Sequence, residues 1–419
     1  MTTPANSPRR ILFASLVGTA IEFFDFYIYG TAAVLVFPQL FFPSIDPAAA
    51  TLASLATFAI AFFARPVGAA LFGHFGDRIG RKATLVAALL TMGVSTVVIG
   101  LLPTYHSIGI LAPVLLALCR FGQGLGLGGE WGGAVLLAVE NAPPGKRAWY
   151  GMFPQLGAPV GLFFSGAVFL LLTTLLSDEQ FLTWGWRVPF VASALLVALG
   201  LYVRLAITET PVFAQAMERR VKLPMLTVAR QHWRPLGIGI LVGLSTFVLF
   251  YVMTVFTLSW GTTAMGYTRD EFLVFQLWGS ICFAIAIPIS ALFAERARRR
   301  TTLIINLLIV GFGVMFATLF EAGPTGALMM TIAGMALIGL IYAPLGTQLS
   351  EQFPTPVRYS GTAITYNLSA IVGASLAPYA ATWLAQHHGL QAVGWYVAAS
   401  GALAMVGLMM IREARDEAL

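Results

Sequence analysis

Five ionisable residues lie well inside long apolar runs of this sequence. They are Glu22, Asp25, Arg65, Arg120 and Glu130. A charged side chain at the centre of a bilayer costs about 2.5–3.5 kcal/mol on insertion scales, so such residues usually have a function. Three carboxylates facing two guanidinium groups leave one carboxylate unmatched, and a spare buried carboxylate can exchange a proton. The set therefore indicates proton transfer within a membrane, with purely structural ion pairs as the alternative.

The first two acids belong to one regular pattern. Gly18, Glu22, Asp25 and Tyr29 recur at spacings of four, three and four residues, so they share one face of a helix. Glu22 lies near the middle of the apolar run that contains it. We therefore expect this face to line the interior of the protein, where either acid could carry the proton.

Arg120 begins a second pattern, a stripe with Gly124 and Gly128 that lets another helix approach closely. Residues 124–129 match the Gly-x-Gly-x-x-Gly motif of dinucleotide-binding loops. They lie within an apolar helix, however, and lack the preceding strand and turn that such a loop needs. An arginine at mid-membrane favours a carboxylate ligand through charge-assisted hydrogen bonds. Arg65 and Glu130 lie at similar depth and could form a second pair or a gate. We predict a substrate site formed by Arg65, Arg120, Tyr29, Gln155, Tyr251 and Asn367.

The composition defines the elements that must position these residues. Of the 419 residues, 58% are hydrophobic and 10% are charged, and the mean hydropathy is +0.82, whereas a soluble domain has about 25% charged residues. Apolar stretches long enough to cross about 30 Å of hydrocarbon recur along the whole chain. We predict an all-α polytopic membrane protein with twelve transmembrane helices at 11–37, 51–75, 83–102, 108–139, 149–176, 186–206, 236–260, 271–294, 302–319, 326–349, 359–385 and 391–411.

The basic residues indicate how these helices are oriented. Apart from Arg65, Arg120, Arg187 and Arg269, they all fall in the even-numbered loops, in the two tails or at the end of the sixth span. Basic loops remain on the cytoplasmic side, so both termini are predicted to be cytoplasmic. The same clusters are short and separated by membrane spans, which argues against a nucleic-acid surface.

An internal repeat divides the chain into two halves. The segment 73–82, Gly-His-Phe-Gly-Asp-Arg-Ile-Gly-Arg-Lys, is matched by 291–300, Ala-Leu-Phe-Ala-Glu-Arg-Ala-Arg-Arg-Arg, and Glu140 and Arg147 are matched by Glu351 and Arg358. We predict two pseudo-symmetric six-helix bundles, 1–206 and 236–419, joined by a cytoplasmic loop at 207–235. Parallel repeats of this kind place the substrate near the midplane, between the halves.

These motifs carry a family resemblance. The segment from Gly73 to Lys82 resembles the signature of the major facilitator superfamily. Further motifs at 22–26, 65–68, 128–133, 184–190 and 209–211 resemble the metabolite:proton symporter family, which includes α-ketoglutarate, citrate, shikimate and proline/betaine permeases. The first half looks closest to shikimate permease and to uncharacterised bacterial inner-membrane metabolite transporters, whereas the second-half loop has lost most of the signature.

The resemblance implies roles for particular residues. A helix 1 acid and a helix 4 arginine form the proton-linked pair in many facilitators, which implies Asp25 or Glu22 with Arg120, and Glu130 nearby. It also implies a conformational latch that bridges the cytoplasmic ends of the two halves. The latch would consist of Gly73, Asp77, Arg78, Gly80, Arg81, Glu140 and Arg147, with solvated surface charge as the alternative interpretation.

The expected function follows from these assignments. We expect a monomeric, multi-pass protein of the bacterial inner membrane that imports a small organic acid with protons by alternating access. It would be no enzyme and would use no cofactor or metal, because the proton gradient supplies the energy. Its partners would be the metabolite, the proton and the lipid bilayer. A proline/betaine-type osmolyte symporter and a proton-driven efflux antiporter are the alternatives.

Overall fold

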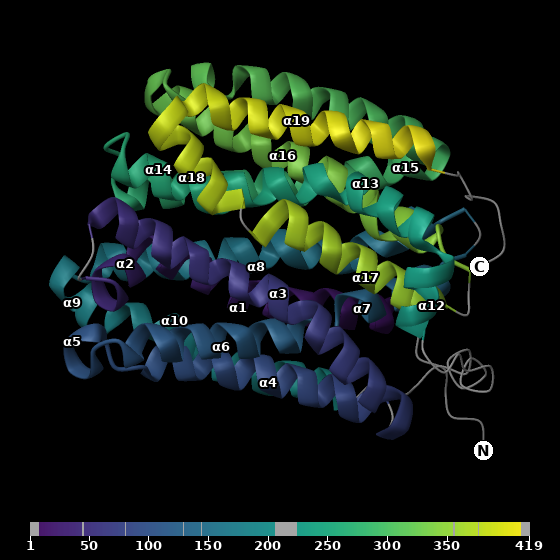
Figure 1. Ribbon diagram of the computed structural model, residues 1–419, viewed down its shortest axis with the longest axis horizontal. Coiled ribbons are helices and arrows are strands. Elements are labelled where there is room, and N and C mark those ends of the chain that lie inside the picture. Colours follow the sequence, from purple (N-terminus) through teal and green to yellow (C-terminus); the bar gives the residue numbers. More distant parts are fainter. Residues whose placement is uncertain are drawn as a thin grey trace.

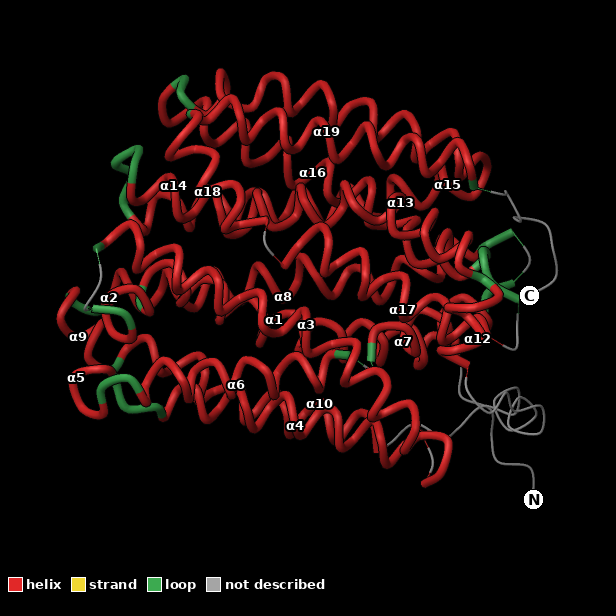
Figure 2. Tube along the Cα trace, in the orientation of Figure 1, coloured by secondary structure: helices red, strands yellow, loops and turns green. Residues whose placement is uncertain are grey.

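The computed structural model describes residues 8–43, 46–79, 81–128, 130–143, 145–205, 224–354, 357–375 and 377–411. Every regular element in these ranges is helical, and most of the connecting loops gather at two opposite ends (Figure 2). Helix α1 begins at the same end at which α19 finishes (Figure 1). We call this the terminal end and the opposite one the far end.

The helices of the first half follow the predicted spans. They are α1 (Pro8–Leu35), α2 (Phe37–Phe41), α3 (Pro47–Ile79), α4 (Arg81–Leu101), α5 (Tyr105–Ile108), α6 (Leu111–Leu127), α7 (Trp131–Glu140), α8 (Arg147–Leu175), α9 (Asp178–Thr183), the 3₁₀ turn η1 (Gly185–Arg187) and α10 (Val188–Leu205). Most of the predicted loop at 207–235 lies outside the described residues, which include its α12 (Pro224–Gln231).

The second half continues with helices of similar length. They are α13 (Trp233–Tyr251), the π-helical turn η3 (Val252–Phe256), α14 (Thr257–Thr263), α15 (Arg269–Phe320), α16 (Gly323–Ser350), α17 (Arg358–Ala370), the π-helical turn η5 (Ile371–Ser375), α18 (Ala377–His388) and α19 (Leu390–Met410).

The predicted spans all correspond to helices in the described part of the chain. Ten helices there are long and apolar enough to cross a membrane, and Val86–Leu101 is a shorter apolar helix at the third span. One of the ten, Arg269–Phe320, contains two predicted spans. Its 52 residues would extend about 78 Å if straight, far more than one bilayer. The non-helical backbone of Ala297 (φ −152°, ψ 71°) separates them.

Three predicted spans are less regular than expected. The fourth span is divided between α6 and α7 at the glycine-rich segment that ends with Glu130. The seventh and eleventh spans each contain a π-helical turn, η3 and η5. Such turns often occur at functional sites, and η3 directly follows Tyr251, one of the predicted substrate residues.

Close packing through glycine holds α6 against α3, as the glycine stripe predicts. A Cβ atom added at Gly124 would lie 2.3 Å from the Ala61 carbonyl oxygen, and one at Gly128 would lie 2.0 Å from that of Arg65. Helix α8 approaches α1 in the same way through Gly161, whose Cβ would lie 2.6 Å from the Phe24 nitrogen. These contacts fix the backbones that carry Asp25, Arg65 and Arg120.

A glycine-to-alanine pair tests this packing. Gly124→Ala should lower the thermal unfolding midpoint of the purified protein, because its methyl group meets backbone atoms that cannot move aside, and overpacking of this kind costs about 1–3 kcal/mol. The control is Gly311→Ala, since nothing lies within 4 Å of that position. It should leave the midpoint unchanged or slightly raised, because alanine favours a helix. Equal midpoints for the two variants would contradict the packing role.

Candidate functional site

The guanidinium group of Arg120 is fully buried among aromatic rings. Its carbon Cζ lies 4.3 Å from the ring centre of Phe26, 4.0 Å from that of Tyr29 and 4.5 Å from that of Phe58. Cation–π attraction favours this arrangement, the more so where water is excluded. Arg120 makes no ion pair within the described part of the chain. The direct pairing with Asp25 or Glu22 that the family resemblance implies is therefore absent from this conformation.

Arg120 connects to α4 through polar side chains instead. Its Nη1 donates to Oε1 of Gln123 at 2.9 Å, and Nε2 of Gln123 donates to Oγ1 of Thr96 at 2.8 Å. Its Nε and Nη2 are buried and make no hydrogen bond to a described residue. Arg120 therefore has donors left over for a ligand, as a substrate-binding arginine requires.

Asp25 lies at the other end of this polar network. Its side chain is almost completely buried, Ser193 of α10 donates to Oδ1 at 2.5 Å, and Thr96 also approaches the carboxyl group. Oδ2 is buried without a hydrogen bond to any described residue. Asp25 thus retains one oxygen that can accept a proton without breaking an existing bond.

Arg65 faces the second half of the protein. Its Cζ lies 5.0 Å from the ring centre of Phe26 and 4.7 Å from that of Phe62, and its side chain also interacts with the hydroxyl group of Tyr251. Phe26 therefore contacts both guanidinium groups. Two cations and a second-half tyrosine consequently converge around one ring.

Tyr251, from the second half, packs against three phenylalanine rings of the first half. Its ring centre lies 6.1 Å from Phe26, 5.5 Å from Phe58 and 5.3 Å from Phe62. Tyr29, also predicted to bind substrate, is fully buried and shares a 2.6 Å hydrogen bond with Thr57. Both predicted tyrosines thus lie next to the arginines.

Gln155 ties the two halves together. It accepts a 3.1 Å hydrogen bond from the indole nitrogen of Trp131 and donates one of 3.1 Å to the Tyr342 carbonyl oxygen. Trp131 in turn stacks on Tyr366 of α17, with ring centres 3.5 Å apart and planes 14° from parallel. Both ends of the Gln155 amide are therefore occupied in this conformation, and a substrate would have to replace one of these bonds.

The other predicted residues occupy varied positions. Glu22 is buried on α1, within electrostatic range of both Asp25 and Tyr366. Glu130 is buried at the N-cap of α7, where the fourth span is broken. The side chain of Asn367 donates to the Ala363 carbonyl oxygen of its own helix at 2.9 Å. Asn367 is therefore associated with the site only by its position on α17.

Contacts at the terminal end join the halves through Glu351, the residue that directly follows α16. Its carboxylate lies 3.7 Å from Arg147 of α8 and also accepts a hydrogen bond from Arg298 of α15. Nearby, Glu295 accepts a 2.7 Å hydrogen bond from the backbone nitrogen of Trp149 at the start of α8. An acid at a helix N-terminus is favourable because it satisfies an unpaired N–H group there.

Only part of the predicted latch falls within the described structure. Arg147 is described and contacts the second half, as above. Gly80 and the side chains of Asp77, Arg78, Arg81 and Glu140 lie outside the described residues, and of Gly73 only the helical backbone is described. Arg358, which matches Arg147 in the internal repeat, donates to the Phe353 carbonyl oxygen at 3.1 Å.

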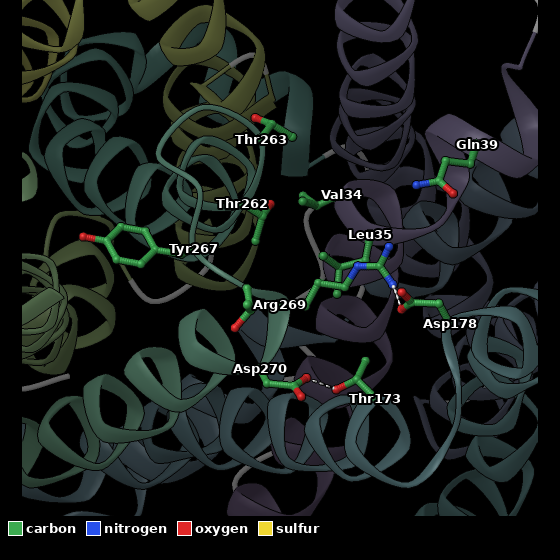
Figure 3. Close-up of a pocket in the computed structure, with 11 residues that line it drawn as sticks. Val34, Leu35, Gln39, Thr173, Asp178, Thr262, Thr263, Tyr267, Arg269 and Asp270 are labelled. Carbon is green, nitrogen blue, oxygen red and sulfur yellow. Dashed lines mark hydrogen bonds and ion pairs between the residues drawn. The ribbon is translucent and has the colours of Figure 1, made fainter. Parts of the chain in front are cut away.

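The far end contains a cavity of about 420 Å³ between the halves. Figure 3 shows its lining, with two interactions across it: Arg269 with Asp178 at 3.2 Å, and the Thr173 hydroxyl donating to Asp270 at 2.5 Å. Asp178 is largely exposed, so its ion pair with Arg269 contributes little stability. The far end is thus held by two polar contacts around an open space.

Several residues of the network were not predicted from the sequence. They are Gln123, Thr96 and Ser193 around Asp25, and Glu295 at the terminal end. The only sequence signals were the i, i+3 spacing of Arg120 and Gln123, which places them on one helix face, and the match of Glu295 to Asp77 in the repeat.

Comparisons with known proteins identify relatives of this chain. The model of the "Sugar (and other) transporter" family matches residues 11–230. The "Inner membrane metabolite transport protein YhjE" of Escherichia coli (strain K12) is 55% identical, over 100% of this chain and 97% of that protein. The "Shikimate transporter" of the same organism is 36% identical, over 91% of this chain and 89% of that protein. Among solved structures, the D-xylose-proton symporter shares the fold with a TM-score of 0.73 at 18% identity, covering 98% of this chain and 99% of that one.

The Glu351 junction can be opened selectively. Glu351→Gln should weaken contacts with Arg147 and Arg298 at once and raise the labelling rate of a cysteine placed at the fully buried Val135 of α7. Val135 faces Gly346 of α16, so it becomes accessible only when the halves separate. We expect an increase of about tenfold, equivalent to about 1.4 kcal/mol.

The labelling uses maleimide on protein in which Cys119 and Cys282 are replaced by serine. The control is Glu321→Gln, an exposed acid at the end of α15. If the labelling rate stays at the control value in well-folded Glu351→Gln protein, Glu351 does not keep the terminal end closed.

Proposed function

Because the chain belongs to the sugar (and other) transporter family of the major facilitator superfamily, we propose that it imports a small organic acid together with protons by alternating access. Family membership makes it a membrane-embedded transporter of small molecules, not an enzyme. The acid, the proton coupling and the direction of transport are the parts that we propose.

The observation that carries this proposal is the set of unused guanidinium donors. Nε of Arg65, and Nε and Nη2 of Arg120, are buried without hydrogen bonds to described residues. A buried donor left unsatisfied costs about 1–3 kcal/mol, and more when it is charged. A carboxylate would satisfy these donors in the forked geometry that arginine favours. An anionic substrate therefore fits this site better than a neutral one.

The aromatic rings argue against a cationic substrate. A quaternary ammonium group binds best in a cage of exposed ring faces, but Phe26, Tyr29, Phe58 and Phe62 already face Arg65 or Arg120. The guanidinium groups would repel a further positive charge there. A betaine-type osmolyte and an exported cationic drug are therefore weaker candidates than an organic acid.

Asp25 is the proposed proton site. It is one of the most deeply buried acids described and has a free oxygen. Thr96, which approaches it, is linked to Arg120 by hydrogen bonds through Gln123. A proton on Asp25 would remove a negative charge as the anionic substrate binds, which couples the two. Glu22 lies within electrostatic range of Asp25, and its negative charge would favour the protonated form of Asp25.

The remaining proposals concern orientation and assembly. The basic residues support placing the terminal end, and both chain termini, in the cytoplasm of a bacterial inner membrane. Arg147, Glu351 and Glu295 would then act with the Gly73–Lys82 segment as a cytoplasmic latch. We propose a monomer as the transporting unit, with the proton gradient as its energy source.

Substitution of Asp25 tests the proton coupling. In proteoliposomes, Asp25→Asn should abolish accumulation of substrate against its gradient, because an amide cannot exchange a proton, while counterflow exchange continues. The control is Asp46→Asn, since the exposed Asp46 caps α3 through the backbone nitrogens of Ala48 and Ala49, and asparagine caps equally well. Uphill accumulation by Asp25→Asn protein would remove Asp25 and leave Glu22 as the candidate.

Substitution of Arg120 tests recognition of the acid. Lysine keeps the positive charge but loses the planar fork, so Arg120→Lys should fold normally yet bind the substrate about ten- to a hundredfold more weakly, consistent with the loss of one or two charge-assisted bonds. Calorimetric binding to a panel that includes shikimate, citrate, α-ketoglutarate, proline and betaine measures this effect and identifies the substrate class. Unchanged affinity and pH dependence would exclude Arg120 from the site, and binding of betaine alone would favour the osmolyte alternative.

A further inference from the structure

A line of hydrogen-bonding side chains crosses four helices of the first half. Arg120 donates to Gln123 on α6, and Gln123 donates to Thr96 on α4. Thr96 approaches the carboxyl group of Asp25 on α1, which accepts a hydrogen bond from Ser193 on α10. Gln123 and Thr96 are almost completely buried, at 1% and 0% exposure. Burying a polar side chain in an apolar region costs free energy unless it is hydrogen-bonded, so each of these side chains depends on its neighbours in the line.

The chemistry of the groups fixes the direction of the bonds. A guanidinium group can only donate, so the Gln123 amide must turn its oxygen to Arg120 and its nitrogen to Thr96. The Thr96 hydroxyl then accepts from Gln123 and keeps a single proton to donate. Two acceptors compete for this proton: the Met92 carbonyl oxygen, at 3.0 Å, and the Asp25 carboxylate. The charge on Asp25 decides which acceptor is the stronger.

This competition links two sites that share no direct bond. When Asp25 is ionised, its carboxylate attracts the Thr96 proton, and when it is protonated, the Met92 carbonyl retains it. Rotation of the hydroxyl changes how well Thr96 accepts from Gln123, and the strength of that bond affects how firmly Gln123 holds Arg120. In the opposite direction, an anion that draws Arg120 away would release Gln123 and Thr96.

We propose that Gln123, together with Thr96, transmits the protonation state of Asp25 to the substrate-binding guanidinium group of Arg120. Gln123 is thus a positioning residue that acts through Arg120. This inference rests on the proposed function, in which Asp25 carries the proton and Arg120 binds the acid. The other charged group that faces Asp25 in the described structure is Glu22 of the same helix; the packed helices α4 and α10 contribute the uncharged Thr96 and Ser193.

The test measures coupling between Asp25 and Arg120 without any substrate. Infrared difference spectra of the reconstituted full-length protein, titrated with acid, report the carboxylic C=O band of Asp25, which is identified by its loss in Asp25→Asn. Arg120→Lys should shift the midpoint of this titration. In a Gln123→Leu background the connection is cut. There Arg120→Lys should shift the titration midpoint by less than about half of the shift that it causes in otherwise wild-type protein, and this difference is the non-additivity that a double-mutant cycle measures.

Thr96→Val provides a second route, because it removes only the hydroxyl group and nearly keeps the volume. It should reduce the coupling like Gln123→Leu. Its matched control is Thr331→Val. Thr331 is also fully buried and, among the described residues, bonds only the carbonyl oxygen of Ala327 in its own helix. The control should leave the coupling unchanged. A size-exclusion profile for each variant excludes misfolding as the cause.

The outcomes separate this inference from the proposed function. If wild-type protein has no titrating band that depends on Asp25, then Asp25 is not the proton site and both proposals are overturned. If the band is present and Arg120→Lys shifts it equally with and without Gln123, only the inference is overturned. A shift that depends on both Gln123 and Thr96 would support the relay.

Discussion

Arg120 is buried without a carboxylate partner among the described residues, and the centre of this protein depends on this constraint. A guanidinium group in a low-dielectric interior must be compensated, and here ring faces and one amide oxygen compensate it only in part. The glycine contacts between α3 and α6 hold the backbone in the necessary position. The described groups therefore leave this positive charge incompletely satisfied, and the proposed binding of an anionic substrate would complete its compensation.

The halves meet through different chemistry at different depths. At the centre the contacts are mainly aromatic, as in the stacking of Trp131 on Tyr366 and the packing of Tyr251 against Phe58. Such contacts can separate without leaving a bare charge in the membrane. The two ion pairs given above between the halves, Arg147 with Glu351 and Arg269 with Asp178, lie at the two ends instead. Movement of one half against the other consequently breaks its charged contacts close to water, where ions are easily solvated.

The sequence was sufficient to predict the helices and the charged residues that they bury, but not how these charges are connected. Apolar runs of about twenty residues, and the charged residues within them, can be recognised directly in the sequence. In the structure Glu22, Asp25, Arg65, Arg120 and Glu130 are all buried. Gln123, Thr96 and Ser193 are neutral residues in apolar helices, and their meeting depends on helix rotation that a single sequence does not specify. The π-helical turns after Tyr251 and Ala370 were missed for a similar reason, since one extra residue in a turn leaves no distinct pattern.

The bond between Ser193 and Asp25 has a consequence for biogenesis. These residues are 168 positions apart in the chain, and synthesis proceeds at about 5–20 residues per second. Asp25 is thus made roughly 10–30 s before the residue that hydrogen-bonds to it exists. The first helix must therefore enter the membrane while Asp25 still lacks its hydrogen bond from α10. Slow or interrupted translation between these two residues would therefore be expected to yield degraded protein in place of stable half-molecules.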